Sequence, residues 1–274
     1  MSEKIKIELG YVQLTLLLPL WGRAIETEKP NPKIIDNTAK EIIKKIDYNF
    51  SLISENIQEI TQFEWIARSI HIDNTIKEFL RQYPKATIVN VGCGLDTTFD
   101  RVDNGKLFWY DLDLPVVIEL RRKFISESDR RKFISYSFLD DRWFKELHIE
   151  ENVLLMAAGV LYYFEENQLK EIFNKIVEKF PGSEIVFDAA STMGVRISNK
   201  KVIQSSGLDE KSYLKWGINS ATEITKWNNK IKVEKEYPMF KILTKGLNLK
   251  NKLMAKISDH YKIMYMVHLK VITT

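Results

Sequence analysis

Short apolar strands alternate with amphipathic helices between residues 86 and 190, and this alternation constrains the fold more than any other feature. Five apolar runs rich in β-branched and aromatic residues are separated by turns or helical segments. Such an alternation builds right-handed βαβ units, and these units form a parallel sheet covered by helices on both faces. The predicted strands are residues 86–92, 106–114, 132–139, 152–163 and 183–190, and the clearest helices are residues 115–128 and 167–180.

The alternation stops after residue 191. The stretch to about residue 229 is polar and helical. Residues 230–242 and 260–272 then alternate between apolar and polar with period two, which is typical of half-buried antiparallel strands. The sequence therefore predicts an α/β fold with a seven-stranded, doubly wound, Rossmann-like sheet that is closed by an antiparallel C-terminal hairpin.

The chain shows no internal repeat, low-complexity tract or linker that would divide it. We expect a single domain over residues 1–274. Helices in about residues 1–83 precede the first strand of the sheet, and residues 191–229 form an inserted helical lid. Both additions are placed where they can cover the carboxyl ends of the strands.

Composition excludes several classes of partner. The 274 residues carry a net charge of only +4, and the lysines are scattered, so no basic stripe suited to nucleic acid is present. Cys93 is the single cysteine and the four histidines lack metal-ligand spacing, which argues against disulfides and a metal centre and fits a reducing cytoplasm. The apolar stretch 11–21 is too short for a membrane span. We expect a cytoplasmic protein with no nucleic-acid or membrane partner.

Two glycines one residue apart, Gly92 and Gly94, follow the first strand of the predicted sheet. In an open α/β sheet, ligands bind beside this strand, and glycines there let backbone N–H groups approach closely. A dinucleotide loop has a third glycine where this chain has Thr97, and Asp96 would repel a pyrophosphate. The loop therefore favours S-adenosylmethionine, a nucleoside cofactor without phosphate, over a nicotinamide dinucleotide. A tight turn that binds nothing is the alternative.

Two acids end the second strand of the sheet. Asp111 and Asp113 are two residues apart and so share one face of the strand. A carboxylate at this place accepts hydrogen bonds from both ribose hydroxyls of a nucleoside. The alternatives are simple surface exposure, or a helix cap by Asp113 for the helix that starts at Pro115.

These residues resemble a known family. "VNVGCGLDTTFDRV" and "WYDLDLPVVIELRRKF" are similar to the glycine-loop and acidic-strand motifs of the leucine carboxyl methyltransferase family, which includes polyketide O-methyltransferases of the tetracenomycin type. The resemblance extends from about residue 21 to residue 235. It includes "GRAIETEKPNPKIIDNTA", "WIARSIHIDNTIKEFL", "SFLDDRWF", "AAGVLYYF", "GSEIVFDAAS" and, in the lid, "YLKWGINSATEITKW".

The resemblance implies a class I methyltransferase fold, S-adenosylmethionine as the methyl donor and an oxygen as the acceptor. It assigns the carboxylate of the cofactor to Arg68, its amino-acid end to Gly92 and Gly94, its ribose to Asp113, and its adenine to Asp140 or Asp141.

One position departs from the family pattern. The family has Ala-Glu-Gly after the fourth strand, with the glutamate facing the amino-acid end of the cofactor, whereas this chain has Ala157-Ala158-Gly159. Loss of that charge-assisted hydrogen bond weakens binding by about 1.5–3 kcal/mol if nothing replaces it. Asp96 or another acid would have to compensate for Ala158.

Methyl transfer from a sulfonium mainly requires alignment of the acceptor and exclusion of water. A carboxylate acceptor needs no base, whereas a hydroxyl needs one nearby. Tyr162, Tyr163 and His71 are the candidates for the acceptor side, with core packing as the alternative. Cys93 is expected to pack rather than to act as a nucleophile. The aromatic residues expected either to enclose an apolar acceptor or to form the core of the cap are Trp21, Tyr213, Trp216 and Trp227.

The leading hypothesis is an S-adenosylmethionine-dependent O-methyltransferase that acts on a small-molecule carboxylate or hydroxyl, such as a polyketide-like natural product. A protein C-terminal carboxyl methyltransferase is the second candidate. The third is a degenerate, non-catalytic binding protein with a methyltransferase fold, which the alanine at position 158 suggests.

Overall fold

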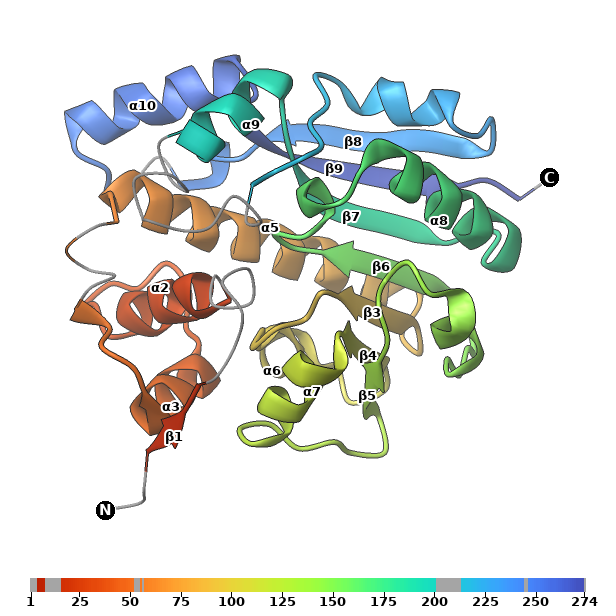
Figure 1. The fold of residues 1–274 in the computed structure, drawn as a ribbon, viewed down its shortest axis with the longest axis horizontal. Helices are drawn as coiled ribbons and strands as arrows, with labels where there is room; N and C mark the ends of the chain where they lie inside the picture. The colour runs from red at the N-terminus through yellow and green to blue at the C-terminus, as the bar shows by residue number, and fades with distance from the viewer. Residues whose placement is uncertain are drawn as a thin grey trace.

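A computed structural model of the chain describes residues 4–7, 16–51, 55, 57–200, 213–243 and 246–273. Its centre is a seven-stranded sheet with the order β5-β4-β3-β6-β7-β9-β8 (Figure 1). The strands are β3 (Thr87–Val91), β4 (Phe108–Asp113), β5 (Arg131–Ser135), β6 (Val153–Ala157), β7 (Glu184–Ala190), β8 (Ile231–Pro238) and β9 (Met264–Val271). The sheet predicted from the sequence is confirmed.

Strands β5, β4, β3, β6 and β7 pair in parallel, and β9 pairs antiparallel with both β7 and β8. The strand order reverses at β3, which lies between β4 and β6, so the carboxyl end of β3 is the switch point where such sheets bind ligands. The glycine loop follows β3 directly. The chain thus places its most constrained loop at the position where a cofactor is expected.

One predicted boundary was wrong. The fourth strand ends at Ala157 rather than at residue 163, because Gly159 has a φ of 79° and turns the chain into the 3-10 helix η2 (Leu161–Tyr163). The last two strands, β8 and β9, pair antiparallel, as predicted. The 3-10 helix η6 (Lys241–Leu243) and helix α10 (Leu249–His260) lie between them.

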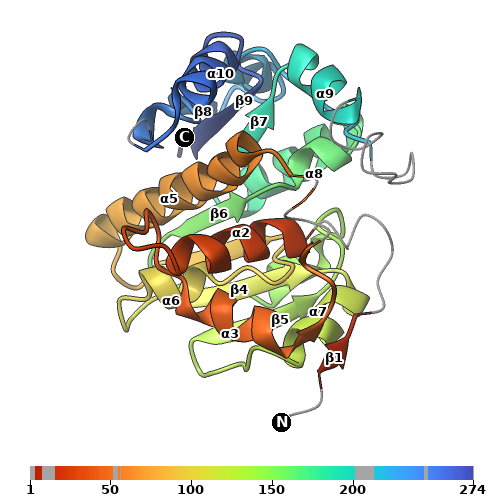
Figure 2. The ribbon, with the colours of Figure 1, turned by 90° about the vertical axis from the view of Figure 1, so that its left-hand side faces the viewer.

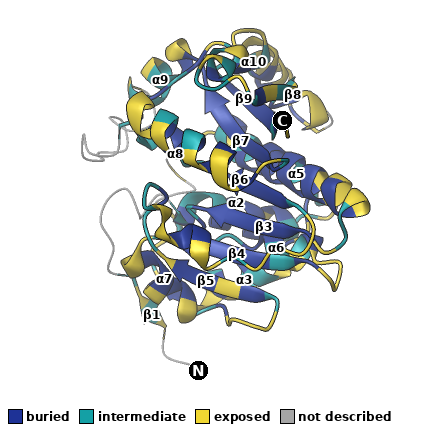
Figure 3. Cartoon of the chain, turned by 90° about the vertical axis from the view of Figure 1, so that its right-hand side faces the viewer, coloured by how far each residue is buried: buried dark blue, intermediate teal, exposed yellow. Residues whose placement is uncertain are grey.

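Helices cover both faces of the sheet (Figure 2). One face packs on α8 (Glu166–Lys179), η1 (Asp141–Lys145) and η5 (Ala221–Lys226), and the other packs on α5 (Glu59–Gln82). The inner strands β3, β6, β7 and β9 are buried almost throughout, whereas the edge strand β8 is mostly half-buried or exposed. Helix α8 alternates between buried and exposed residues, as a helix with one apolar face should (Figure 3).

The remaining helices are α2 (Leu17–Thr27), α3 (Asn37–Lys45), α6 (Thr98–Val102), α7 (Pro115–Arg122) and α9 (Thr192–Ser198), and β1 (Ile5–Lys6) pairs with β2 (Ile46–Asp47). The predicted apolar helix near the N-terminus is α2, although residues 11–15 lie outside the described residues. The predicted lid contains α9 and η5, and its residues 201–212 also lie outside them. No helix in the described ranges has the length and apolar character that a membrane crossing requires.

Helix α5 leads directly into β3, so the two run in opposite directions and the N-terminal half of α5 lies toward the carboxyl ends of the strands. Arg68, in this half, contacts Asp188 near the end of β7. Helix α5 therefore brings charged side chains to the carboxyl ends of the strands, where the glycine loop also lies.

Candidate cofactor site

The loop after β3 has the backbone that its glycines predict. Gly92 and Gly94 have φ angles of 61° and 46°, a region that residues with side chains rarely adopt. A Cβ atom on Gly92 would lie 2.6 Å from Val160. The N–H groups of Gly92 and Cys93 both donate to the carbonyl of Leu112, at 2.8 and 3.2 Å. The loop is thus folded tightly over the end of β4.

Asp113 joins the glycine loop to the end of β4. Its Oδ2 accepts a hydrogen bond from the N–H of Gly94 at 2.8 Å, and its Oδ1 accepts one from Leu114 at 2.7 Å. Burial raises the pKa of its carboxyl above the usual value. Asp113 does not cap α7, whose first residue follows Leu114 without a side-chain cap. It stands at the strand end where the ribose role was predicted for it.

Asp111 has a different environment from Asp113. It is fully buried and its carboxylate accepts hydrogen bonds from Asn90, Trp109, Arg121 and Arg131 at 2.8–3.0 Å. These four donors occupy both oxygens and tie β3, β4, β5 and α7 together. The ribose role expected for Asp111 was therefore wrong, because the residue lies two positions inside the strand, beneath α7.

Asp96 is engaged within the loop itself. Its oxygens accept from the backbone N–H of Thr98 at 2.9 Å and from the Thr98 hydroxyl at 3.1 Å, and Arg23 lies 3.7 Å away. Burial alone would raise the pKa of Asp96, but Arg23, Arg101 and the Thr98 hydrogen bonds hold it at about 2. The carboxylate is ionised and already paired with cations.

A buried charge network fixes the N-terminal helices on this loop. Asp36 accepts from Arg23 and from Arg101, both at 2.8 Å, and also from the hydroxyl of Thr97. Arg101 reaches Asp73 on α5 at 2.8–2.9 Å. Burial opposes ionisation of Asp36, but the two guanidinium groups lower its pKa. The network links α2, α3, α5 and α6, and the sequence analysis assigned it no role.

Arg68 lies where β6 and β7 end. Its Nη1 donates to Asp188 Oδ2 at 2.9 Å, and the other oxygen of Asp188 accepts from the N–H of Gly159 at 2.6 Å. A Cβ on Gly159 would lie 2.9 Å from the same Nη1. The hydroxyl of Tyr162 is 3.5 Å from Nη1. Arg68 therefore sits directly beside the Ala-Ala-Gly segment, with its Nη1 committed to Asp188.

Glu64 is a candidate site residue that the sequence analysis did not identify. It lies four residues before Arg68 on α5, on the same side of the helix. It is one turn nearer to the N-terminus of α5, the end that lies toward the carboxyl ends of the strands. Burial raises its pKa from 4.5 to about 7 against the opposing effect of Arg68. Its half-buried carboxylate accepts no hydrogen bond from any residue in the described ranges. A partly buried carboxylate without a hydrogen-bond donor indicates a binding residue, and only the structure shows that Glu64 carries such a carboxylate.

His71 was wrongly expected on the acceptor side. Its Nε2 donates to the carbonyl of Met239 at 3.0 Å, and its ring packs on Tyr237 with 4.8 Å between centroids. Burial lowers the pKa of His71, so the ring is neutral. The side chain is directed to the end of β8 and supports the core there.

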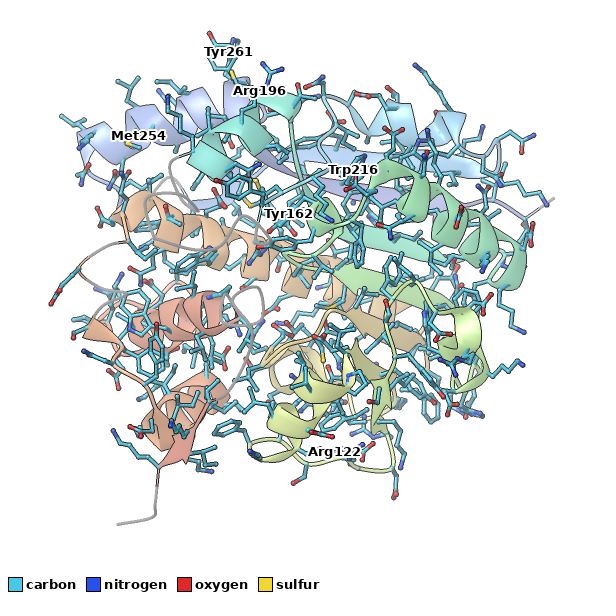
Figure 4. All side chains as sticks on the ribbon, in the orientation of Figure 1. Arg122, Tyr162, Arg196, Trp216, Met254 and Tyr261 are labelled. Carbon is cyan, nitrogen blue, oxygen red and sulfur yellow. The ribbon has the colours of Figure 1, made fainter. Side chains whose placement is uncertain are left out.

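The two tyrosines after β6 lie beside Arg68. Tyr162 is buried, its ring is 5.1 Å from that of Tyr163, and its carbonyl accepts from the N–H groups of Lys215 and Trp216 (Figure 4). Burial raises the pKa of the Tyr162 phenol well above its usual value. Tyr162 thus stays a neutral hydroxyl, and it joins η2 to the lid.

The two acids after β5 have surface partners. Asp140 accepts from the backbone and guanidinium of Arg142 and caps η1, and these hydrogen bonds hold its pKa at about 2. Asp141 pairs with Lys175 of α8 at 2.9 Å. The structure therefore places Asp140 nearer to the strand end and directs Asp141 toward α8.

The remaining predicted residues pack in the core. Cys93 is buried, and burial raises the pKa of its thiol well above the usual value, as expected for a packing residue. Trp216 and Trp227 belong to the core cluster beneath the lid, with 5.7 Å between their rings. Trp21 packs on Trp65. Core packing, the alternative for these tryptophans, is what the structure shows.

The fold and the loop define a class I methyltransferase. A solved structure of a methyltransferase from Thermobifida fusca has the same fold, with a TM-score of 0.59 over 92% of this chain and 94% of that chain, at 12% identity. The cofactor of this class is S-adenosylmethionine, and the bare glycine loop, Asp113 at the strand end and the charged side chains of α5 fit it.

The chain belongs to the leucine carboxyl methyltransferase family, whose sequence profile matches residues 17–177. It is 29% identical over 216 residues to the tetracenomycin polyketide synthesis O-methyltransferase TcmP of Streptomyces glaucescens, with 78% of each chain covered. It is 27% identical over 234 residues to the S-adenosyl-L-methionine-dependent methyltransferase dpfgK of Gibberella zeae, with 77% and 78% covered. The protein is an S-adenosylmethionine-dependent methyltransferase.

Proposed function

We propose that this enzyme is an O-methyltransferase that acts on a small-molecule carboxylate or hydroxyl, and that it works in the cytoplasm. The observation that carries the proposal is the positive-φ glycine loop bonded to Asp113 at the switch point, in a chain similar to a polyketide O-methyltransferase. The single, buried cysteine fits a reducing compartment.

In this proposal, the two ends of the cofactor are held by different strands. The backbone of Gly92 and Gly94 receives the amino-acid end, and Asp113 accepts from the ribose hydroxyls with the lone pairs that Gly94 and Leu114 leave free. Asp140, which follows β5, would bind the adenine.

Arg68 and Glu64 would bind the charged groups of the amino-acid end. Arg68 has guanidinium N–H groups beyond those given to Asp188, and they suit the carboxylate of the cofactor. An ammonium group needs an acceptor, and Asp96, Asp111 and Asp188 are each engaged by several donors. Glu64 is the acid beside Arg68 that lacks such donors, so we propose that it replaces the carboxylate missing at Ala158.

When bound, S-adenosylmethionine supplies an electrophilic methyl group. The protein must then direct an acceptor oxygen along the line of the breaking bond and keep water out. Because the phenol of Tyr162 is neutral, it suits donation of a hydrogen bond that orients the acceptor, not removal of its proton. Tyr163 lies beside it on the same 3-10 helix. A carboxylate acceptor, already anionic, fits this environment without a base.

The alanine at position 158 also supports the alternative of a binding protein that has lost turnover. Isothermal titration with S-adenosylhomocysteine tests whether the site binds, and transfer of labelled methyl from the cofactor to small carboxylic acids and phenols tests turnover. Binding without transfer to any small molecule or protein, together with activity after Ala158→Glu, would favour the degenerate form.

Two glycine variants test the loop itself. Gly94→Val is expected to abolish S-adenosylhomocysteine binding, since it introduces a side chain at a φ of 46° against Leu16. Gly105→Val is the matched control, because Gly105 also has a positive φ, 78°, but no atom within 4 Å of its Cβ position. Equal binding by both variants would contradict the loop assignment.

A further inference from the structure

Helix α10 exposes most of its large apolar residues to solvent, while it buries small residues and packs Met254 partly against the core. The residues that it buries are Asn251, Ala255 and Ser258. Four large apolar residues at spacings of four are exposed instead, and we call them the α10 ridge. The ridge consists of Leu249, Leu253, Ile257 and Tyr261, which are 85%, 61%, 44% and 54% exposed.

This arrangement is the reverse of an ordinary surface helix, which turns its apolar stripe inward. Single exposed apolar residues are normal on protein surfaces, but a contiguous row of them marks an interaction site. The helix is held by its other side, where Asn248 caps its first turn and the amide of Asn251 donates to Glu59 of α5.

The charge around the ridge is strongly positive. Residues 241–262 contain six lysines and one aspartate, a net charge of +5, whereas the whole chain has +4, so all other residues together sum to −1. Lys250, Lys252 and Lys256 are exposed along α10. The single acid, Asp259, is half-buried, accepts from the N–H of Phe240 at 3.0 Å, and has its pKa raised by burial. By formal charge, the net positive charge of the protein lies on this segment, where Lys262 is paired with Glu236 of β8.

The ridge lies on the outer edge of the molecule. Figures 1 and 2 both place α10 at the rim, and Figure 4 shows Tyr261 projecting outward beyond the ribbon. A helix of 12 residues is about 18 Å long. The C-terminal end of α10 leads into Met264, which pairs with Ala190 at the carboxyl end of β7. The C-terminal end of the ridge therefore lies toward the carboxyl ends of the parallel strands, where the candidate cofactor site is.

We propose that the α10 ridge docks the enzyme on an anionic lipid membrane surface. Leucine and isoleucine would enter the boundary of the acyl chains, Tyr261 would lie at the headgroup level, and the flanking lysines would meet anionic headgroups. The sequence analysis expected no membrane partner because no apolar stretch is long enough to span a bilayer, and surface docking requires no span. The inference goes beyond the proposed function and does not depend on it.

Two other occupants fit the ridge less well. A second copy packed on the same face would bring two +5 segments together, and this repulsion opposes a symmetric dimer. An acidic protein would need a surface that matches this row of side chains, whereas a fluid bilayer adapts to it. Charge and shape together select the lipid surface.

Vesicle co-sedimentation of the full chain tests the proposal. The wild-type protein is expected to bind vesicles of phosphatidylcholine with 30% phosphatidylglycerol at least tenfold more tightly than pure phosphatidylcholine, and to dissociate as salt rises. Ile257→Asp is expected to weaken the partition at least tenfold, and Leu253→Asp likewise. The control is Ile149→Asp, which changes the same residue type at a similar exposure of 41% in the loop before β6.

Three outcomes would overturn the proposal. The first is an absence of wild-type binding to anionic vesicles. The second is equal loss of binding in Ile257→Asp and Ile149→Asp. The third is a dimer, detected by sedimentation velocity without lipid, that Ile257→Asp dissociates, since the ridge would then be an interface between two copies. Circular dichroism of each variant, matched to the wild type, ensures that a lost interaction is not lost folding.

Discussion

Replacement of Glu64 by glutamine separates a cofactor-binding role from a structural one, because the two roles predict opposite changes in stability. Burial raises the pKa of Glu64 from 4.5 to about 7. The folded protein therefore holds this proton more tightly than the unfolded chain does. Below pH 4.5 both states are protonated and the group contributes nothing. As pH rises toward 7, folding becomes less favourable by about 3 kcal/mol in all.

The stability of the Glu64→Gln variant follows from this sign. At pH 8 the variant is expected to be more stable than the wild type by about 2 kcal/mol, less than the full value because some water reaches the carboxylate. At pH 4.5 the two proteins should be equally stable. Thermal denaturation without ligand measures this difference, and we expect a rise in Tm of about 4 °C at pH 8.

Affinity for the cofactor should change in the opposite direction. A charge-assisted hydrogen bond to an ammonium group is worth about 1.5–3 kcal/mol, so the variant should bind S-adenosylhomocysteine about 10–150-fold more weakly at pH 8. In the wild type the proton on Glu64 must leave before the ammonium group binds. Affinity should therefore fall about tenfold per pH unit below 7, whereas that of Glu64→Gln should be nearly constant between pH 5.5 and 8.

Isothermal titration across this pH range provides the measurement, and Glu78→Gln is the matched control. Glu78 lies on the same helix, but it is exposed and paired with Lys235. The reasoning is refuted if Glu64→Gln binds as tightly as the wild type, or if the variant is less stable at pH 8. Either result would make Glu64 a residue of the fold and leave the ammonium group without an acceptor.

Three further variants or probes test the rest of the site. Asp113→Ala should weaken S-adenosylhomocysteine binding at least tenfold in titration calorimetry, because Gly94 and the ribose lose the same acceptor. Asp111→Asn should lower the free energy of unfolding by about 3–5 kcal/mol in urea denaturation and leave the affinity of the folded protein unchanged, because it leaves Arg121 and Arg131 buried without their anion; a stable variant would contradict the structural role. Cys93 should resist a thiol reagent at pH 8 in the native protein and react on unfolding, since burial raises its pKa; fast native labelling would show that the loop opens.

The sheet could be predicted because apolar runs, turns and amphipathic helices recur regularly along the sequence. Runs of buried β-branched residues marked every strand of the sheet, and most ends within a few residues, the end of β6 excepted. The loop between β8 and β9 was not predictable in the same way, since α10 directs its apolar residues outward and buries Asn251 and Ser258. A method that looks for an inward apolar stripe finds none there.

Sequence spacing also does not show how deeply a side chain is buried within the sheet. Asp111 and Asp113 have the same side chain and share a face of β4, yet the first is fully buried under two arginines and the second reaches the glycine loop. Similarly, His71 lies three residues after Arg68 on α5, but it bonds to the end of β8 while Arg68 bonds to β7. Periodicity assigns a face, and only the packed neighbours decide which partner a long side chain reaches.

The acid at position 64 could not have been found by comparing motifs position by position. The sequence located a deficit, Ala158, on the segment after β6, and the proposed replacement comes from a different element, α5, that precedes the whole sheet. The charge balance of the site points to Glu64. Arg68 is neutralised by Asp188, so the ionised form of a second, unpaired carboxylate beside that pair is unfavourable. A bound cation removes this cost. The amino-acid end of the cofactor supplies a carboxylate for the free side of Arg68 and an ammonium group for Glu64. An unpaired carboxylate at this place lowers the stability of the protein and raises its affinity for an ammonium group. Selection for binding, rather than for stability, produces such a site.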